Sequence, residues 1–441
     1  MTAERSTSDS SVVWRSSVAA ISLLLVLQLG LAYRDAINFP FSDHVDLFFP
    51  YFAGFDLGQF FFQQHGPHRQ GVGPLLMYPV LIASDWDFRV LSYLAVAING
   101  LAAFVFLKCL MFLRVCLATA LLCIAVLLSL LSFELITITP NISHSTLPLL
   151  FACMVFSGIA QRGFSSALEE LPVFIIVVLA MFTGFGIFIF LAYQCVLILR
   201  ISRSQYVAGK WEISSTTPIG YLLISILVLM SFFYDYRFGG TGGCNAAELS
   251  DWASVLEFGA AMFGVVPALD VMPTVVVSTG AVGFLFLLAT LGFCIYEYFR
   301  GGAALPLASA FFIFLSLGFV AIATVGRHCM DGTAGSASRY FILSTLGYVG
   351  AVVVLDRYGP LWLKDRLNIW FAGVTIIALL VGFYLGQYGS AHWRTHKELF
   401  LSCVERGQSI ETCSSEYYVH PSPQRLRSFL AELAQARASD R

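Results

Sequence analysis

The topology of this 441-residue chain depends on residues 171–199, LPVFIIVVLAMFTGFGIFIFLAYQCVLIL. This apolar stretch is long for one membrane span, which needs about 20 residues, and short for two. Thr183-Gly184-Phe185-Gly186 lies at its midpoint, where the glycines allow the chain to turn. The stretch therefore predicts two short helices joined as a hairpin. One long tilted helix is the alternative, and it would reverse the sidedness of everything downstream.

The composition indicates a membrane protein. Hydrophobic residues make up 58% of the chain and charged residues 12%, with a mean hydropathy of +0.79. Soluble proteins carry about 45–50% apolar and about 25% charged residues. These values exclude a cytosolic enzyme and a disordered scaffold. The net charge of -2 provides no basic surface for nucleic acid, so no nucleic-acid partner is expected.

Other apolar stretches predict the remaining spans. The first, 18–33, is not followed by a signal-peptide cleavage site, so we expect it to be retained. The others are 90–107, 112–132, 147–160, 217–234, 274–296, 304–325, 340–355 and 368–386. Together with the hairpin they predict an all-α polytopic membrane protein with about 11 transmembrane helices.

Lysine and arginine indicate the orientation, because they collect in short cytoplasmic loops. Placing residues 1–17 inside as a cytoplasmic tail puts most of the Lys and Arg that flank the spans inside too. The transmembrane domain is then 18–388, and 389–441 is a small periplasmic tail. The long outward loops are 34–89, 134–147, 235–272 and 326–338. Polar residues concentrated on one side of the membrane favour chemistry there.

The first outward loop contains the candidate catalytic residues, Asp43 and Asp46, within Phe41-Ser42-Asp43-His44-Val45-Asp46. Carboxylates three residues apart share one face of a helix. The aromatic run 47–52 that follows suits a helix at the lipid–water interface. There a lipid-borne donor would meet a water-exposed acceptor. Helix capping and solvation are the structural alternative for the two aspartates.

Candidate substrate-binding residues lie in the same loop and in two others. A guanidinium is well suited to clamping phosphate, although an arginine that anchors a helix end to headgroups is the alternative. These candidates are His44, His65, His68, Arg69, Glu134, Arg327, His328, Arg339 and Tyr340. The histidines and aspartates also suit a divalent metal, but no zinc-specific spacing is present, so no metal or cofactor is assigned.

Four of the ten cysteines fall on the predicted outer side, where an oxidising compartment favours pairing. Cys403 with Cys413 is the preferred disulfide, and Cys244 with Cys329 is the second. The other cysteines lie in or beside spans and are expected to pack as small hydrophobic residues. In the tail, residues 425–438 predict one amphipathic helix.

The chain resembles the GT-C glycosyltransferases, integral membrane enzymes that use polyprenyl-phosphate sugars. The resemblance is carried by Phe41-Ser42-Asp43-His44-Val45-Asp46, His65-Gly66-Pro67-His68-Arg69 and Ser338-Arg339-Tyr340. It implies a bacterial inner-membrane enzyme with a periplasmic active site. Asp43 would be the acid/base at the acceptor hydroxyl, Asp46 would support it, and Arg339 would hold the donor phosphate.

More narrowly, the length and pattern resemble the TfpW-type pilin glycosyltransferases. That group is associated with moving D-arabinofuranose from a lipid-phosphate donor to type IV pilin, so the implied acceptor is a Ser or Thr of pilin, another protein or a glycan. Two other classes remain open. A lipid or small-solute transporter or flippase of the cell envelope would carry charged residues deep inside its spans. A structural subunit of an envelope complex would leave the loop carboxylates dispensable.

Overall fold

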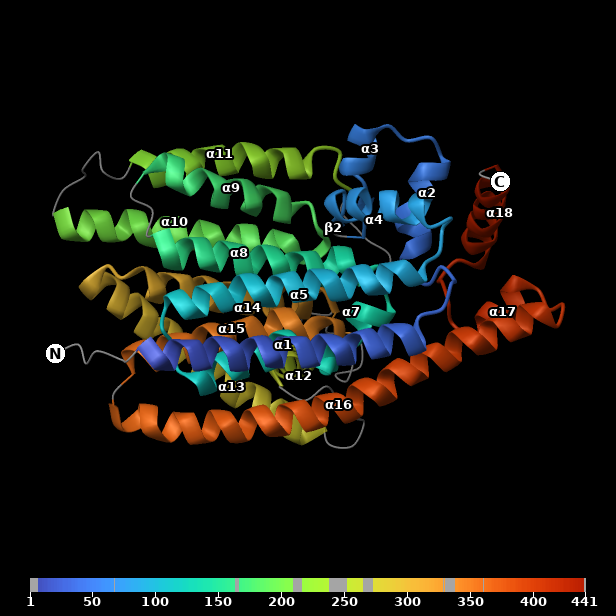
Figure 1. Ribbon diagram of the computed structural model, residues 1–441. Helices are drawn as coiled ribbons and strands as arrows, with labels where there is room; N and C mark the ends of the chain where they lie inside the picture. Colours follow the sequence, from blue (N-terminus) through green and yellow to red (C-terminus); the bar gives the residue numbers. More distant parts are fainter. Residues whose placement is uncertain are drawn as a thin grey trace.

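The protein is a bundle of apolar helices with a polar cap at one end. The computed structural model describes residues 7–66, 68–162, 166–208, 216–237, 252–264, 273–327, 329, 338–359 and 361–439. The first helix begins at the left-hand end in Figure 1, and the short helices α2, α3, α4, α17 and α18 gather at the right-hand end. In the described part of the chain, the two-residue strands β1 (Gln64–His65) and β2 (His68–Arg69) form the only sheet.

Eight helices of the described residues are long and apolar enough to cross a membrane. They comprise α1 (Thr7–Asp35), α5 (Arg89–Phe112), α8 (Leu147–Arg162) with the π-helix η2 (Ile142–Thr146), α10 (Ile187–Ala208), α13 (Pro273–Gly301), α14 (Ala304–Arg327), α15 (Ser338–Tyr358) and α16 (Leu361–Glu405). Each contains a predicted span. An all-α polytopic membrane architecture is therefore what the structure shows.

Shorter apolar helices occupy the other predicted spans and part of the outward loops. The first group is α6 (Leu117–Leu127), α9 (Ala167–Met181) and α11 (Thr216–Phe233). The second group is α4 (Val72–Ala83) and α12 (Trp252–Phe263). Buried aromatic rings of α5, α8 and α14 pack at the centre, where Phe156 contacts both Phe106 and Phe312.

The hairpin prediction for residues 171–199 is confirmed, and the single long helix is wrong. Helix α9 ends at Met181, the 3-10 turn η3 (Gly184–Gly186) follows, and α10 begins at Ile187. Glu170 at the start of α9 is fully buried and pairs with Arg200 near the end of α10. This pairing requires the two helices to run antiparallel. The tip is tight, because a Cβ on Gly186 would overlap the carbonyl oxygen of Ala180.

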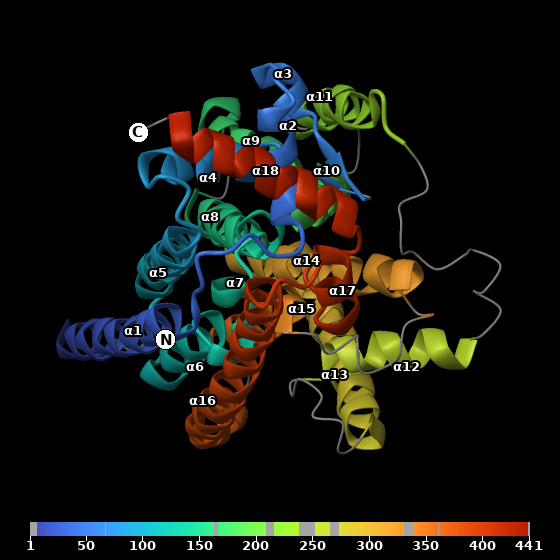
Figure 2. The same ribbon diagram turned by 90° about the vertical axis from the view of Figure 1, so that its right-hand side faces the viewer.

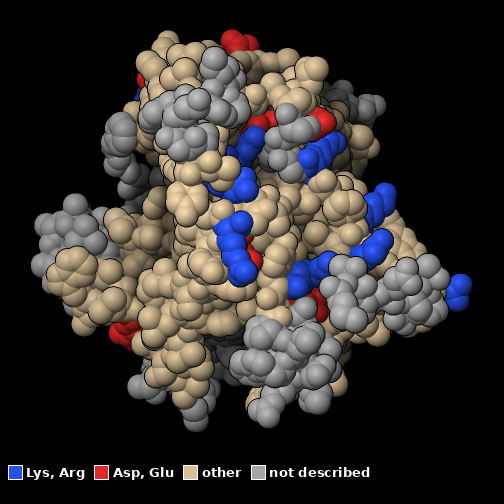
Figure 3. All heavy atoms as spheres, turned by 90° about the vertical axis from the view of Figure 1, so that its left-hand side faces the viewer, with Lys and Arg blue, Asp and Glu red and all other residues tan. Residues whose placement is uncertain are grey.

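Lysine and arginine side chains gather at the end of the bundle opposite α2 (Figure 3). They come from the ends of α5, α8, α10, α13 and α15 that lie away from the polar cap: Lys108, Arg114, Arg162, Arg200, Arg203, Arg300 and Arg357. This end is therefore basic, whereas the other end combines the predicted acidic loop with arginines such as Arg327, Arg339 and Arg425.

Three predicted boundaries fall within helices or buried segments of the structure. Helix α1 begins at Thr7, within the predicted polar tail 1–17. The predicted outward loop 134–147 is buried throughout and contains α7 (Glu134–Thr137) and η2. The predicted boundary at 388/389 falls inside α16, which continues to Glu405 because its polar residues find partners beyond the apolar span.

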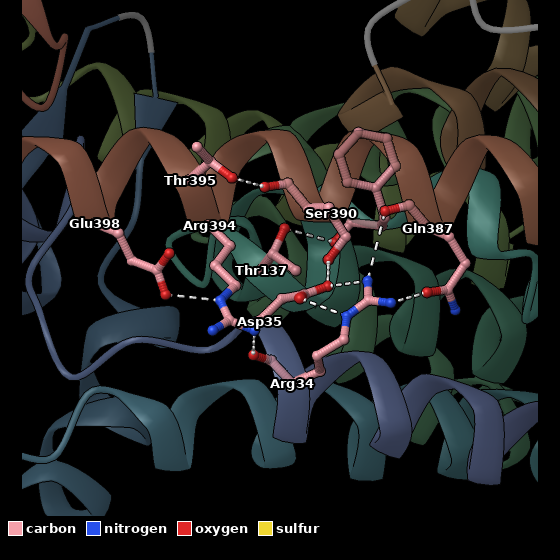
Figure 4. A network of polar contacts seen from close by, with 10 residues as sticks. Arg34, Asp35, Thr137, Gln387, Ser390, Arg394, Thr395 and Glu398 are labelled. Carbon is pink, nitrogen blue, oxygen red and sulfur yellow. Dashed lines mark hydrogen bonds and ion pairs between the residues drawn. The ribbon is translucent and has the colours of Figure 1, made fainter.

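Those partners form a network between α16 and the end of α1 (Figure 4). Asp35, which is 1% exposed, pairs with Arg34 and accepts a hydrogen bond from Ser390. Arg394 donates to the backbone oxygen of Arg34 at 3.0 Å and pairs with Glu398 at 2.8 Å. The network fixes α16 to α1 where α16 leaves the apolar bundle.

Replacing Glu170 with Ala should lower the free energy of unfolding by roughly 3 kcal/mol, because a buried ion pair between α9 and α10 is lost. Thermal unfolding in detergent measures the change. The exposed neighbour Glu169 provides the control, since Glu169→Ala removes a carboxylate of the same helix turn. Equal unfolding midpoints for Glu170→Ala and Glu169→Ala would contradict a stabilising role of the Glu170–Arg200 ion pair.

Candidate functional site

The two predicted catalytic aspartates lie at the start of α2 (His44–Phe52). Asp43 directly precedes the helix and Asp46 lies in its first turn. The Asp43 side chain makes no capping hydrogen bond, so helix capping does not explain this residue. The preceding Ser42 has a φ of +51°, and its N–H donates to the backbone oxygen of Val419 at 2.8 Å. A strained residue thus places Asp43 at the helix start.

His65 of β1 bridges the two aspartates. Its Nε2 lies 3.5 Å from Asp43 Oδ1, and its Nδ1 lies 3.6 Å from Asp46 Oδ2. We call Asp43, Asp46 and His65 the acidic cluster. Burial lowers the pKa of His65, but the hydrogen bond to Asp43 and the charges of both aspartates outweigh it and raise the pKa above its ordinary value.

The same interactions favour the ionised form of Asp43. Partial burial raises its pKa, but the hydrogen bond from His65 and the charges of His144 and His65 outweigh burial, so the pKa lies below the usual range. The carboxylate remains 34% exposed, so a substrate can reach it from water. Asp43 is therefore an ionised, accessible base.

Asp46 is held by two residues of the C-terminal segment. His420 Nε2 lies 3.2 Å from Asp46 Oδ2, and Arg425 Nε lies 2.9 Å from Oδ1. His420 Nδ1 lies 3.1 Å from the backbone N and 3.0 Å from the backbone O of Ser422, so Ser422 holds one edge of the ring while Nε2 faces Asp46. Sequence analysis missed both partners. In the sequence, the only indication of His420 and Arg425 is a group of polar residues near the start of the predicted tail helix.

The π-helix η2 connects the acidic cluster to α15. His144 Nδ1 lies 4.0 Å from Asp43 Oδ2, and the adjacent Ser145 donates its hydroxyl to the backbone oxygen of Arg339 at 3.1 Å. Gly184 at the hairpin tip is required here, because a Cβ would lie 2.3 Å from His144 Cδ2. Neither His144 nor Ser145 was a predicted site residue. Short π-helices are frequent at functional sites.

Two predicted arginines lie around one tyrosine ring. The guanidinium carbons of Arg327 and Arg339 lie 5.3 Å and 5.1 Å from the centroid of the Tyr340 ring, and Arg327 also donates to its hydroxyl. We call Arg327 and Arg339 the basic pair. Glu134 Oε2 lies 3.7 Å from Arg339 Nη1 and accepts its backbone N–H at 3.1 Å. Among the described residues, one carboxylate lies beside the two guanidiniums here.

Tyr418 lies within the influence of both charged groups. Burial raises its pKa and so does the negative charge of Asp43, whereas the charge of Arg339 lowers it. The ring is 48% exposed, and the Arg339 side chain is 33% exposed. Tyr418 therefore lies within electrostatic range of both Asp43 and Arg339, and both Tyr418 and Arg339 are partly exposed to solvent.

The structure does not support substrate binding by His44 or Arg69. His44 is buried, accepts the N–H of Phe41 at Nδ1 and contacts Thr139 Oγ1 at 2.7 Å through Nε2. Burial lowers the pKa of His44 to about 3, which keeps the ring neutral. Arg69 donates to the backbone oxygens of Phe62, Phe232 and Tyr234. Sequence alone could not show that these side chains have polar partners within the protein.

His68 lies beside the acidic cluster without joining it. Its ring centroid is 5.8 Å from that of His144 and 5.0 Å from that of Phe185. Its Nδ1 is buried and has no hydrogen-bond partner among the described residues. Burial, together with the charges of His144 and Arg327, lowers its pKa well below the ordinary value. His68 is thus a neutral imidazole packed against His144 and Phe185.

The remaining predicted residues have mixed outcomes. The Cys403–Cys413 disulfide is confirmed, and Cys329 is disulfide-bonded too. Its predicted partner, Cys244, lies outside the described residues, as does His328. The predicted tail helix 425–438 is confirmed as α18 (Pro423–Ser439), with Leu426, Phe429 and Leu433 buried.

The acidic cluster also offers a donor set for a metal. Asp43, Asp46 and His65 each contribute one candidate ligand atom, and these atoms lie within 4.8 Å of one another. Two carboxylates and an imidazole suit a divalent cation such as Mn²⁺ or Zn²⁺. The same atoms pair with each other and with His420 and Arg425, so the geometry is also complete as a set of ion pairs.

Comparisons of the chain with protein-family models, curated proteins and solved structures returned no match.

Two histidines of the β1–β2 hairpin should affect stability with opposite pH dependence. The folded pKa of His65 is raised, so its ion pairs stabilise fully below about pH 6.5 and their contribution is lost as pH rises through the folded pKa. The folded pKa of His68 is lowered, so His68 destabilises the fold as pH falls below about 6.5.

Thermal unfolding of H65Q and H68Q between pH 5.5 and pH 9 tests both signs. Relative to wild type, H65Q should lose most stability at low pH, whereas H68Q should gain there. Parallel pH curves for the two variants would contradict the assigned environments.

Proposed function

We propose that this protein is a GT-C-like membrane glycosyltransferase that moves a sugar from a polyprenyl-phosphate donor to a hydroxyl acceptor outside the cytoplasm. The observation that carries the proposal is η2, whose His144 faces the Asp43 carboxylate while Ser145 bonds the backbone of Arg339. One rigid element thereby joins a candidate base to a candidate phosphate-binding pair. Glycosyl transfer from a lipid phosphate needs both functions.

Asp43 suits the proton-transfer role. It is ionised and one-third exposed, so its carboxylate can accept the proton of a Ser, Thr or sugar hydroxyl as that oxygen attacks the anomeric carbon. Asp46, held by His420 and Arg425, supports His65 from the other side. The bond that breaks joins the anomeric carbon to the phosphate oxygen, and its electrons leave with the polyprenyl phosphate.

The basic pair suits the leaving group. Negative charge develops on the phosphate as it departs, and fixed guanidiniums stabilise that charge without reorganising. Arg339 begins α15 and Arg327 ends α14, so both lie where long apolar helices meet the polar cap. A lipid phosphate whose chain remains in the bilayer would present its headgroup at this depth.

The proposed setting is a bacterial inner membrane, with the basic end of the bundle in the cytoplasm and the polar cap in the periplasm. The concentration of Lys and Arg opposite α2 supports this orientation (Figure 3). The Cys403–Cys413 disulfide near the polar cap is suited to an oxidising compartment. About 11 spans, counting α6, α9 and α11 with the eight longer helices, complete the proposed topology.

Within this class, D-arabinofuranose as the sugar and type IV pilin as the acceptor form the narrower proposal. Intact-mass analysis of envelope proteins and surface glycans, with and without the gene, tests it. A pilin mass lower by one pentose residue in the deletion strain is the expected result. A mass change on another acceptor would keep the enzyme class and replace the narrower proposal, whereas no mass change on any acceptor would count against the class.

Asp43→Asn should reduce transfer by about 10²–10⁴-fold, because the amide cannot accept the acceptor proton. Membrane insertion should be unchanged, since Asp43 makes no helix-capping bond. His44→Asn, which alters a buried neighbour outside the acidic cluster, controls for general damage to α2. Transfer at the wild-type rate by Asp43→Asn would remove this residue from catalysis.

Arg339→Ala should lower kcat/KM for the donor by about 10²-fold while leaving acceptor affinity nearly unchanged. Arg339→Lys should recover only part of the loss, because lysine keeps the charge but not the planar fork. Transfer kinetics with donor and acceptor varied separately provide the measurement. Equal effects on donor and acceptor would contradict the phosphate role.

A further inference from the structure

The C-terminal segment lies across the part of the molecule that carries α2 (Figure 2). It contains α17 (Ile410–Glu416), the connecting residues 417–422 and α18, and we call residues 409–439 the strap. Sequence analysis gave the strap no role in the site. Its contacts with α2 are numerous and of several kinds.

Backbone contact fixes the strained entrance to α2. The N–H of Ser42, the residue with a φ of +51°, donates to Val419 O. A non-glycine residue in this conformation costs roughly 1–3 kcal/mol and persists only where its surroundings enforce it. The strap thus supplies an interaction that holds the residue next to Asp43 in place.

Side chains of the strap hold the rest of α2. Arg425 pairs with Asp46 and also lies 5.1 Å from the ring centroid of Phe49. His420 is 2% exposed and its Nε2 is directed at the other oxygen of Asp46. Farther along, the rings of Phe429 and Phe52 meet at 5.4 Å between centroids. Contacts with the strap therefore continue along α2 to its last residue.

A disulfide cross-links the strap to the helix of the bundle that precedes it. The disulfide joins Cys403 in the last turns of α16 to Cys413 in α17, and both residues are buried. Upstream, α16 is fixed to α1 by the Asp35 network (Figure 4). The path from the bundle to His420 is thus anchored at two places before it reaches the acidic cluster.

We propose that the strap is an oxidation-dependent part of the active site, in which His420 and Arg425 are positioning residues that hold Asp46 toward His65. The expected effect on catalysis rests on the proposed function, whereas the expected effect on the order of α2 does not. With the disulfide open, α17 and the residues that follow stay joined to α16 only through the backbone of residues 406–409. Asp46 and Ser42 then lose fixed partners.

Hydrogen exchange of α2 amides tests the structural part without any substrate. Arg425→Ala and the Cys403→Ser/Cys413→Ser double variant should each speed exchange across His44–Phe52 by at least about fivefold. Arg427→Ala is the matched control, because Arg427 lies two residues farther along α18 and pairs with Glu411 of the strap itself. Unchanged α2 exchange in both test variants would overturn the proposal.

Transfer kinetics test the positioning role. His420→Gln and Arg425→Ala should lower kcat by at least about tenfold and leave the donor KM within twofold, because neither residue belongs to the basic pair. Arg425→Lys should restore most of the rate, since the contact to Asp46 is made through one nitrogen. Faster α2 exchange with wild-type kcat would overturn the positioning role. Absence of transfer by the wild-type protein would count against the proposed function. The hydrogen exchange of α2 would then still test the structural role of the strap.

Discussion

The contact between His144 and Gly184 is the interaction on which the candidate site depends. The chain reverses at 182–186, and the missing side chain of Gly184 lets the hairpin tip pack directly on the π-helix η2. His144 can then face Asp43 while Ser145 binds the backbone of Arg339. The turn at Gly184, which sets the topology of the bundle, therefore also positions His144 next to Asp43 and Ser145 next to the backbone of Arg339.

Much of the fold could be predicted from the sequence because apolar length and glycine placement act locally. The hairpin at Gly184, the helix after Asp43 and the amphipathic helix α18 all follow from short-range patterns. The extent of α16 did not, because its polar end is stabilised by Asp35, a residue far away in the chain. Burial of 134–147 was missed for the same reason: polar residues there find partners only in the folded bundle.

The candidate site shows the same contrast between features set by local sequence and features set by distant partners. The pairing of Asp43 and Asp46 followed from their spacing, and Arg339 followed from its place at a helix start. The partners of His44 and Arg69 could not be predicted, because residue type does not reveal which groups of the fold a side chain will contact. His420 and Arg425 were missed because they lie more than 370 residues from Asp46 in the sequence. Residue type and spacing predicted the chemistry, but partners required the fold.

The central claim is that one outward site breaks the bond between a sugar and a lipid phosphate. It is tested most directly by incubating the purified protein in lipid nanodiscs with a polyprenyl-phosphate sugar and a hydroxyl acceptor, and measuring both products by mass spectrometry. The account predicts equal amounts of free polyprenyl phosphate and glycosylated acceptor, each dependent on the intact acidic cluster. Donor that binds and crosses the bilayer with its sugar still attached would contradict the account and indicate a transporter.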